Sequence, residues 1–588
     1  MALRLSPFPN VFLAGLHGVG WALILPCFWF LDRLIAVCKS TTLERIKRQE
    51  QECYLYPFQV FFGCIIFFVL FLVSAPVALL GFLIWAPLQA CRRPFSYHIE
   101  TLLPLEREAR HNFEGGKATF GFVTANLCLL PDSLARFNNL GHTQRRATTI
   151  GKCIAQGVSR PHIRIFIDSP SSCGTLSASS SLFHTTNSAG YGATDKQTKP
   201  AVNDTSGSVD RVVPAANPNS HVVHIPCDNA KEPAIEPAIE TVPPTAPAVV
   251  NMNQNSNQHG EAGDRNVDLR SQGPGEGDAV PWEISSLFLA NLDILCLEEV
   301  FDKRAAWKLR DALGPVFGHI LYDVGVYACQ TPVCCSSFKF FNSGLFLASR
   351  FPVLEAQYHC FPNSRGEDAL AAKGLLCAKV LIGQNHKQEK VVGYFNCTHL
   401  HAPEGEGEIR CEQLNMVTVW IGEFQTSHRR PDEVVVFDVL CGDFNFDNCS
   451  PDDLREQNHD IFEEYIDPCR AGPGKEKPWV IGTLMEQPMM YEDDVITPEN
   501  LQRTLETEEL RRQYISPPVP VVGLPLVYPL PDEPWVGRRI DYILYCQNSI
   551  AKQCKTEIEE FTFITQLAGL TDHIPVGLRL RVSDFSAE

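Results

Sequence analysis

Carboxylate, amide and imidazole side chains stand at the ends of several apolar runs in this chain. They are Asn126 after "FGFVTA", Glu299 after "DILCLE", His399 after "GYFNCT", Asp443 and Asn445 after "VVFDVLCG", and Asp572 and His573 before "IPVGLRLRV". Each residue alone is explained as well by a cap or a turn. Their joint occurrence at strand ends predicts a shared site.

These residue types fit one kind of chemistry. Carboxylate and amide oxygens are the ligands that a hard divalent ion such as Mg²⁺ prefers. Two histidines can exchange protons near neutral pH, and an aspartate can fix the tautomer of a neighbouring histidine. Together they predict metal-assisted hydrolysis of a phosphate ester.

The segments around these residues predict an α/β fold. Strands are expected within 117–131, 289–302, 343–353, 374–383, 391–401, 434–445, 538–546 and 574–582, and helices at 303–313 and 408–425. This alternation indicates two packed sheets flanked by helices.

The N-terminal part predicts membrane association. Two long apolar runs, 11–31 and 61–90, are each long enough for a bilayer, which needs roughly 20 apolar residues. Pro26 and Pro76 interrupt the runs, and we expect the second to split near Pro76. Basic residues on both flanks favour shallow, re-entrant insertion over spanning, which stays the alternative. Either topology leaves the following chain cytoplasmic.

Basic residues beside the two runs are expected to attract anionic headgroups such as phosphatidylserine. They are Arg33, Arg45, Lys47, Arg48, Arg92 and Arg93. The whole chain carries a net charge of −18, which argues against a nucleic-acid-binding protein.

The composition divides the chain into four parts: membrane-associated segments over 1–95, a first catalytic part over 96–170, a disordered polar insertion over 171–280 and the remaining catalytic part over 281–588. The 22 cysteines contain no CxxC pair. The candidates for acylation are Cys53, Cys64, Cys91, Cys334 and Cys335.

The motifs "TANLCLLPD", "LCLEEVFDKRAA", "GYFNCTHLHAP", "CGDFNFDN", "GRRIDYIL" and "LTDHIPV" together resemble the deoxyribonuclease I-like superfamily of metal-dependent phosphodiesterases. Within it the chain is similar to the neutral sphingomyelinases, in their membrane-bound type 2 branch. The two apolar runs and "LLPDSLARFNNL" extend the similarity over nearly the whole chain, the polar insertion excepted.

The resemblance implies a four-layer α+β sandwich and Mg²⁺-dependent hydrolysis of sphingomyelin to ceramide and phosphocholine at the cytosolic leaflet. Mn²⁺ is a possible substitute for Mg²⁺. The resemblance also implies stimulation by anionic phospholipids and a location at the Golgi and plasma membrane. We also allow for self-association.

The resemblance assigns the metal to Glu299, with Asn126 contacting metal or phosphate. Asp443 and Asn445 match the pair that orients the attacking water and the phosphoryl group. His573 matches the general base.

The remaining matched positions surround that base. Asp541 or another carboxylate orients the ring of His573, and Asp572 is the acidic position beside it. His399 matches the histidine that stabilises the transition state or assists the leaving group. His401 has no matched role and is expected at the surface.

The segment "EDALAAKGLL" (367–376) also matches a sphingomyelinase segment. Its simplest explanation is a solvated turn before a strand. The functional interpretation pairs Asp368 with Lys373 in one loop conformation and brings them into the site in another.

Four other functions are weighed against this one. A nuclease is opposed by the membrane segments and the lack of a basic domain, and an inositol polyphosphate 5-phosphatase by the absence of its Trp-Cys-Asp signature. A phospholipase C acting on lysophospholipids stays open. An inactive membrane scaffold predicts a lost ligand, and none is lost.

Overall fold

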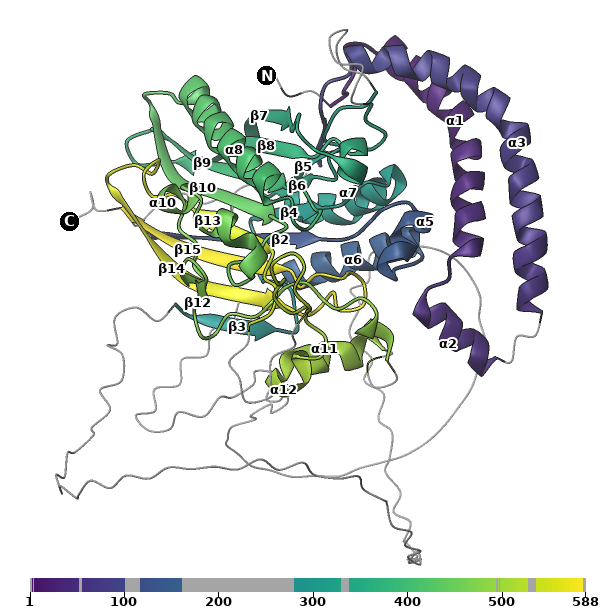
Figure 1. The fold of residues 1–588 in the computed structure, drawn as a ribbon. Helices are drawn as coiled ribbons and strands as arrows, with labels where there is room; N and C mark the ends of the chain where they lie inside the picture. Colours follow the sequence, from purple (N-terminus) through teal and green to yellow (C-terminus); the bar gives the residue numbers. More distant parts are fainter. Residues whose placement is uncertain are drawn as a thin grey trace, which may run out of the picture. The chain divides into compact units, whose positions relative to one another are not determined.

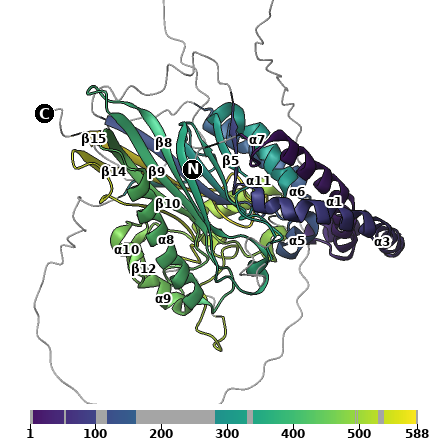
Figure 2. The same ribbon diagram turned by 90° about the horizontal axis from the view of Figure 1, so that it is seen from above.

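The computed structural model describes residues 3, 5–51, 55–100, 117–160, 280–328, 338–492, 495, 497–526 and 536–584. The insertion predicted over 171–280 lies outside these residues except for its last position. Cys53, Cys334 and Cys335 lie outside them too. Figures 1 and 2 show the described elements in two views.

An eight-stranded sheet forms one half of the globular part. Its order is β1 (Ser96–Ile99), β5 (His319–Tyr322), β6 (Phe346–Ser349), β4 (Ile294–Glu298), β2 (Lys117–Asn126), β15 (Val576–Asp584), β14 (Cys554–Ile564) and β3 (Trp282–Ser285). β2 runs parallel to β4 and antiparallel to β15. The centre of the sheet therefore brings β2, from the early part of the chain, next to β15, its last strand.

A five-stranded sheet forms the other half. Its order is β13 (Asp541–Tyr545), β10 (Glu433–Asp443), β9 (Lys390–His399), β8 (Gly374–Gln384) and β7 (Val353–Cys360). β9 and β10 are parallel, and the other neighbours are antiparallel. The strands predicted at 374–383, 391–401 and 434–445 are confirmed as β8, β9 and β10.

The two sheets pack face to face through aromatic side chains. The ring of Phe122 on β2 stacks on Phe395 of β9 with centroids 5.9 Å apart, and Phe120 meets Phe437 of β10 at 5.0 Å. All four side chains are fully buried. Burial of this much apolar area is the main force that holds the sheets together.

Helices cover the outer faces of both sheets (Figure 2). α6 (Thr143–Val158) and α7 (Lys303–Phe317) share a core with β4, and α8 (Gly407–His428) shares one with β8 and β9. The helices predicted at 303–313 and 408–425 are thus confirmed. The layers run helix, sheet, sheet, helix, which confirms the α/β sandwich.

Shorter elements connect these layers. They are the helices α5 (Asp132–Ala135), α9 (Leu454–Gln457), α10 (Ile461–Glu464), α11 (Pro498–Glu506) and α12 (Glu508–Arg511), the strands β11 (Arg470–Gly472) and β12 (Lys475–Glu476), and the 3-10 turns η1 (Gln89–Cys91), η2 (Arg136–Asn138), η3 (Gly366–Leu370), η4 (Pro451–Asp453) and η5 (Met489–Tyr491).

The apolar N-terminal runs form two long helices, α1 (Val11–Cys38) and α3 (Tyr56–Leu88), joined through α2 (Thr42–Glu50). Both are long and apolar enough to cross a membrane. The predicted split near Pro76 is wrong, because α3 continues through this proline. An apolar helix can tolerate an internal proline when nearby groups compensate the lost hydrogen bond.

Two glycines let α1 and α3 approach closely. A side chain at Gly81 would place its Cβ 2.7 Å from the carbonyl oxygen of Gly20 and 2.7 Å from the Cβ of Leu23. Small residues are the usual means of close contact between apolar helices.

Ionic contacts join α1 to the globular part. The guanidinium of Arg33 lies 2.8 Å from the carboxylate of Asp132 on α5, and Asp32 accepts a hydrogen bond of 2.8 Å from the backbone N–H of Ser133. One face of α1 therefore contacts the globular part.

Candidate active site

Three polar side chains lie side by side at one edge of the five-stranded sheet. His399 ends β9, Asp443 ends β10 and Asp541 begins β13, and Asp443 is the register partner of both neighbours. The antiparallel direction of β13 explains why its first residue meets the last residues of β9 and β10. All three side chains are buried.

The opposing sheet contributes Asn126 and two glutamates. Asn126 ends β2 beside Glu298, the last residue of β4. Its Nδ2 donates a hydrogen bond of 2.8 Å to Oδ2 of Asp443 and so bridges the two sheets. Glu299 follows with a φ of 57°, a left-handed conformation that turns the chain sharply at the strand end.

The ring of His573 is held by Asp541. Its Nδ1 lies 2.9 Å from Oδ2 of Asp541, so the orienting carboxylate that the sequence left open is Asp541 in this structure. Burial disfavours the charged ring, but the charge and hydrogen bond of Asp541, with help from Asp443, raise the pKa of His573 well above its usual value. Nε2 is left for another partner.

Asp572 is directed elsewhere. Its Oδ2 accepts hydrogen bonds from Nε2 of Gln487 at 2.8 Å and from Nδ2 of Asn138 at 3.4 Å. It therefore ties two loops to the segment that carries His573. Neither Gln487 nor Asn138 was singled out from the sequence, because neither belongs to a strand-end motif.

The environment of His399 favours the neutral imidazole. Neither ring nitrogen makes a hydrogen bond to another described residue, and Nε2 lies 3.6 Å from Oδ2 of Asp443. Burial, followed by the nearby charge of Lys373, lowers the pKa of His399 well below its usual value.

Asn445 is fixed just beyond Asp443. It has a φ of 56°, its N–H donates to Oδ1 of Asp443, and its Nδ2 donates to the carbonyl oxygen of Leu400 at 3.0 Å. These bonds hold the amide beside the segment that follows His399.

Asp368, Lys373 and His401 form a buried ion-pair cluster next to Leu400, the residue that follows His399. Asp368 Oδ2 lies 2.9 Å from Nζ of Lys373 and 3.2 Å from Nδ1 of His401, and it accepts a hydrogen bond from the N–H of Ala402. Burial alone would raise the pKa of Asp368, but Lys373 and His401 lower it below its usual range. The carboxylate is therefore ionised at neutral pH.

The surface position expected for His401 is wrong. Its side chain is fully buried and contacts both Asp368 and Glu406. The sequence pattern gave no reason to bury it, because both partners come from loops whose course depends on the tertiary fold.

Some carboxylate oxygens of the site are without a hydrogen-bond partner in the described part of the chain. Oε2 of Glu299 and Oδ1 of Asp541 are buried and have no hydrogen-bond partner among the described residues. Burial, and then the charge of Asp572, raises the pKa of Glu299 to about 7, and burial raises that of Asp443 to about 6. Oxygen ligands with unmet charge fit a hard divalent cation.

One ligand group has suitable spacing. Single ligand atoms of Asp443, Asp541 and His573 lie within 4.8 Å of one another. Glu299, the expected principal metal ligand, is not part of that trio. Its pKa nevertheless responds to the charges of Lys373, His573 and Asp443, so it belongs to the same electrostatic environment.

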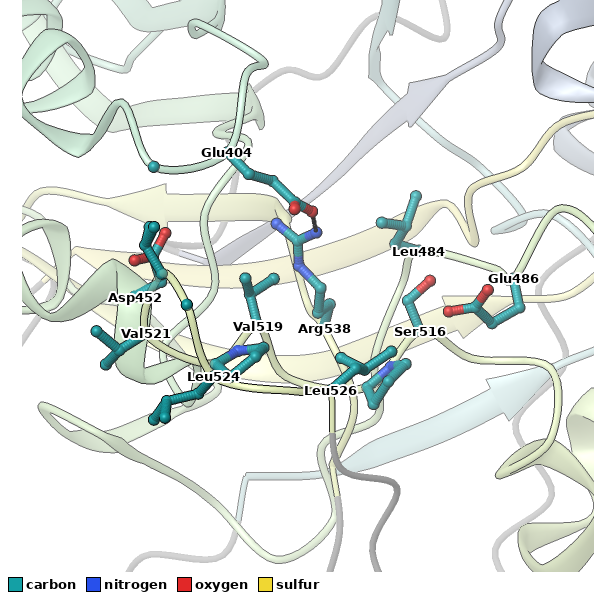
Figure 3. A pocket seen from close by; sticks show the side chains of 15 residues that line it. Glu404, Asp452, Leu484, Glu486, Ser516, Val519, Val521, Leu524, Leu526 and Arg538 are labelled. Carbon is teal, nitrogen blue, oxygen red and sulfur yellow. Dashed lines mark hydrogen bonds and ion pairs between the residues drawn. The ribbon is translucent and has the colours of Figure 1, made fainter.

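Figure 3 shows a groove of about 480 Å³ that is lined by Glu404, Leu484 and Arg538 among others. Arg538, three residues before Asp541, is bound to Glu404 at 2.7 Å on one wall, and Glu486 projects from the other side. Leu484 also lines the groove and forms a β-bridge with His573. The backbone therefore connects the groove to the histidine.

The basic residues near the helices divide into two groups. Arg33 pairs with Asp132, and the side chain of Arg92 is only 2% exposed and pairs with Asp323 at 2.8 Å. The lipid contact expected for Arg92 does not fit this buried position. The remaining four, Arg45, Lys47, Arg48 and Arg93, are exposed or half-buried.

Two acylation candidates lie within the described residues. Cys91 is exposed and Cys64 is half-buried, with its sulfur 3.5 Å from that of Cys38.

Two family models match the chain. Residues 12–91 match the neutral sphingomyelinase N-terminal transmembrane region, and residues 269–573 match the endonuclease/exonuclease/phosphatase family. The second match contains most of the strand-end residues described above.

Known proteins show similarity over the full chain. Sphingomyelin phosphodiesterase 5 of Danio rerio is 60% identical over 586 residues, with 99% of both chains covered. Sphingomyelin phosphodiesterase 3 of Homo sapiens is 40% identical over 667 aligned positions, with 100% of both covered. A crystal structure of a mutant Staphylococcus aureus beta toxin with bound magnesium ions is 15% identical, with a TM-score of 0.29, and covers 50% of this chain and 86% of that chain.

Proposed function

Because the chain belongs to the sphingomyelin phosphodiesterase family and is a hydrolase, we propose that its buried site uses Mg²⁺ and His573 to cleave sphingomyelin into ceramide and phosphocholine. The observation that carries this proposal is the His573–Asp541 pair beside Asp443, which Asn126 links to the other sheet. A base, an acidic cluster and amide donors are what phosphodiester hydrolysis requires.

His573 is the proposed general base. Asp541 holds its Nδ1, which fixes the tautomer and directs Nε2 away from the carboxylate. The base accepts a proton from the attacking water, and the nearby negative charge of Asp541 stabilises the resulting imidazolium. The same contact raises the pKa of His573, so the ring must first lose its proton before it acts as the base, and activity should fall on the acidic side of the pH profile.

His399, Asn126 and Asn445 are the proposed partners of the phosphoryl group. His399 is kept neutral by burial, so it can donate one hydrogen bond without adding a charge. The two asparagine side chains are fixed by hydrogen bonds to Asp443 and to the carbonyl of Leu400. Fixed donors stabilise developing charge without a reorganisation cost.

Glu299 is the proposed principal ligand of the metal, with Asp443 and Asn126 close by. Bound Mg²⁺ would polarise phosphoryl oxygens and acidify water. The unpartnered Oε2 of Glu299 and the pKa that burial raises support this assignment, because a poorly solvated carboxylate oxygen with no hydrogen-bond donor is suited to a cation.

Asp368 and Lys373 are proposed to change partners during activity. The structure has them paired, with Lys373 also donating to the carbonyl oxygen of Leu400, which in turn accepts from Asn445. The carbonyl of Leu400 thus connects the Asp368–Lys373 ion pair to Asn445, at the edge of the five-stranded sheet that carries His399 and Asp443 (the catalytic edge). Separation of the pair would free the ammonium group of Lys373 to contact the phosphoryl group.

We propose shallow membrane insertion at the cytosolic leaflet. α1 contacts the globular part at two places. The ring of Trp21 lies 5.0 Å from Nζ of Lys303, and Arg33 pairs with Asp132. Arg33 is twelve residues beyond Trp21, which corresponds to about 18 Å of helix at 1.5 Å per residue. A helix held to a globular surface over this length is poorly placed to cross a bilayer, whereas the apolar exposed side of α3 can enter it.

Stimulation by anionic phospholipid has a physical route in the structure. α2 carries Arg45, Lys47 and Arg48, and its Thr42 N–H donates to Oδ1 of Asn139 at 2.8 Å. Nδ2 of Asn139 donates to the carbonyl oxygen of Gln487, whose side chain binds Asp572.

Headgroups that bind α2 can therefore bias the segment that carries His573. Acylation of Cys64 or Cys91 would add attachment at the same membrane, and a Golgi and plasma-membrane location is proposed with it.

The test uses the purified full chain and sphingomyelin in mixed micelles, with and without Mg²⁺. We expect phosphocholine release that requires Mg²⁺ and falls at least a hundredfold in His573→Ala. Undiminished release by this variant would contradict the proposal. Lysophospholipid and DNA serve as competing substrates, and preferential cleavage of either would replace sphingomyelin as the substrate.

A further inference from the structure

An apolar cavity of about 430 Å³ lies where α1 and α3 meet the globular part. Leu25 on α1 and Phe82 on α3 form the helical side, and Phe301, Phe341 and Leu370 line the globular side. Its volume falls within the range of ordinary small-ligand pockets.

The lining of this cavity is mainly aromatic. The ring of Phe82 lies 6.0 Å from Phe338, and that of Phe301 lies 5.9 Å from Phe341. Such walls offer a ligand aromatic rings and hydrocarbon surface, with few polar groups. They favour an apolar chain over a polar metabolite.

The charged groups at the cavity's edge have partners in the protein. Lys303 lies 3.7 Å from Asp323 and 4.4 Å from the ring of Tyr327. Asp302 accepts hydrogen bonds from Arg304 and Ala305 as the N-cap of α7. These charges are compensated, so they give no reason to expect a charged ligand inside.

One polar group in the wall lacks a partner. Trp85 lines the cavity and is 5% exposed, and its indole Nε1 has no acceptor among the described residues. A buried indole N–H normally finds an acceptor. An amide carbonyl or hydroxyl on an otherwise apolar ligand would supply one.

The cavity adjoins the catalytic edge. Phe301 is two residues beyond Glu299, and a Cβ on Gly344 would lie 3.0 Å from both the Phe301 ring and the Glu299 backbone. Leu370 is two residues beyond Asp368, and its carbonyl oxygen accepts hydrogen bonds from the N–H groups of Phe340 and Phe341. The same short segments therefore build the cavity wall and the site.

The cavity also adjoins the membrane-facing surface. α3, which supplies Phe82 and Trp85, exposes large apolar side chains on its outer face, among them Phe62, Ile66, Leu80 and Leu83. With α3 inserted as proposed, its apolar side chains would lie between the lipid and the cavity.

We propose that this cavity holds one hydrocarbon chain of the sphingolipid substrate while its phosphodiester lies at the catalytic edge. The assignment rests on the proposed function. A site that takes one chain out of the bilayer brings the phosphodiester of the same lipid from the membrane surface towards His573. It also makes cleavage depend on chain length.

The first test narrows the cavity from the helical side with Leu25→Trp. Leu31→Trp is the matched control, because it adds the same bulk to an exposed position of α1 that does not line the cavity. The assay compares long-chain sphingomyelin in mixed micelles with p-nitrophenylphosphocholine, which has no hydrocarbon chain.

For Leu25→Trp we expect kcat/KM on long-chain sphingomyelin to fall at least tenfold, with kcat/KM on the chainless ester within twofold of wild type. Leu31→Trp should match wild type on both. Unchanged long-chain cleavage, or equal losses on the two substrates, would overturn the proposal. Leu25→Ala, which enlarges the cavity, should shift the preferred acyl chain to greater length and serves if the tryptophan variant does not fold.

The second test is independent of turnover. The full chain in vesicles containing sphingomyelin with a diazirine in its acyl chain is irradiated in EDTA, and cross-links are mapped by mass spectrometry. We expect labelling of α1 and residues 338–341 that unlabelled sphingomyelin competes away and phosphatidylcholine does not. Equal competition by both lipids would indicate a structural lipid and overturn the proposal. Specific labelling without sphingomyelin cleavage would refute the proposed function alone.

Discussion

Replacing Asp541 by asparagine should slow the enzyme through His573 and through no other route. The substitution keeps the size of the buried side chain but removes the negative charge 2.9 Å from Nδ1 of the ring. Hydrogen bonds to charged groups contribute about 1.5–3 kcal/mol. At 1.36 kcal/mol per factor of ten, the expected loss in kcat/KM is roughly 10- to 150-fold.

A double-mutant cycle tests the route. His573→Gln alone should lower kcat/KM by about 10²–10⁴, the range for loss of a general base. In that background Asp541→Asn should change kcat/KM by no more than roughly twofold, because a positioning residue has nothing left to position. Additive losses would refute the coupling.

The pH profile gives a second readout. The charge of Asp541 raises the pKa of His573, so its removal should move the acidic limb of the kcat/KM profile to lower pH. The Mg²⁺ concentration for half-maximal activity must be measured as well, since Asp541 belongs to the trio with metal-ligand spacing. A tenfold rise in that concentration, with an unmoved acidic limb, would assign Asp541 to the metal instead.

Three further predictions concern the metal, the fold and the membrane. Glu299→Gln should raise the half-maximal Mg²⁺ concentration tenfold or more and abolish the rise in Tm that Mg²⁺ gives the wild type; an unchanged Mg²⁺ requirement would exclude Glu299 as a ligand. Burial raises the pKa of Asp438 to about 6 from 3.8, so its stabilising contribution is complete below pH 3.8 and is lost as the pH rises through 6. Relative to Asp438→Asn, wild type should lose about 2 kcal/mol of unfolding free energy between pH 4 and 7, and a pH-independent difference would refute this. Glu44→Gln removes the ion pair that ties α2 to Arg136 at 2.6 Å, so phosphatidylserine stimulation in vesicles should fall by at least half with basal kcat/KM within twofold; full stimulation would contradict the route through α2.

Much of the catalytic edge was predictable because its residues follow apolar runs. Asn126, His399 and Asp443 stand where β2, β9 and β10 end, and a strand end is recognisable from hydrophobicity alone. The short strands β1 and β5 gave no such signal, since four residues are too few to establish a period. β14 was missed because its first half, "CKTEIEE", is polar.

The sequence predicted the two apolar N-terminal segments but not the unbroken course of α3. Apolar runs imply long helices, and a proline at position 76 implied a break that α3 does not have. A proline weakens a helix by a fixed local amount, whereas packing of α3 against α1 at Gly20 and Gly81 depends on both helices at once. A sequence pattern within one helix does not contain the packing energy between α3 and α1.

The amino-acid sequence determined which chemical groups are available and that each stands at a strand terminus. It did not determine their partners. Asp541 rather than Asp572 contacts the ring of His573, and His401 is buried beside Asp368. Those choices follow from strand register, because the pairing of β13 with β10 places Asp541 opposite Asp443. Register is set by contacts between residues distant along the chain, so the tertiary fold alone assigns each carboxylate its neighbour.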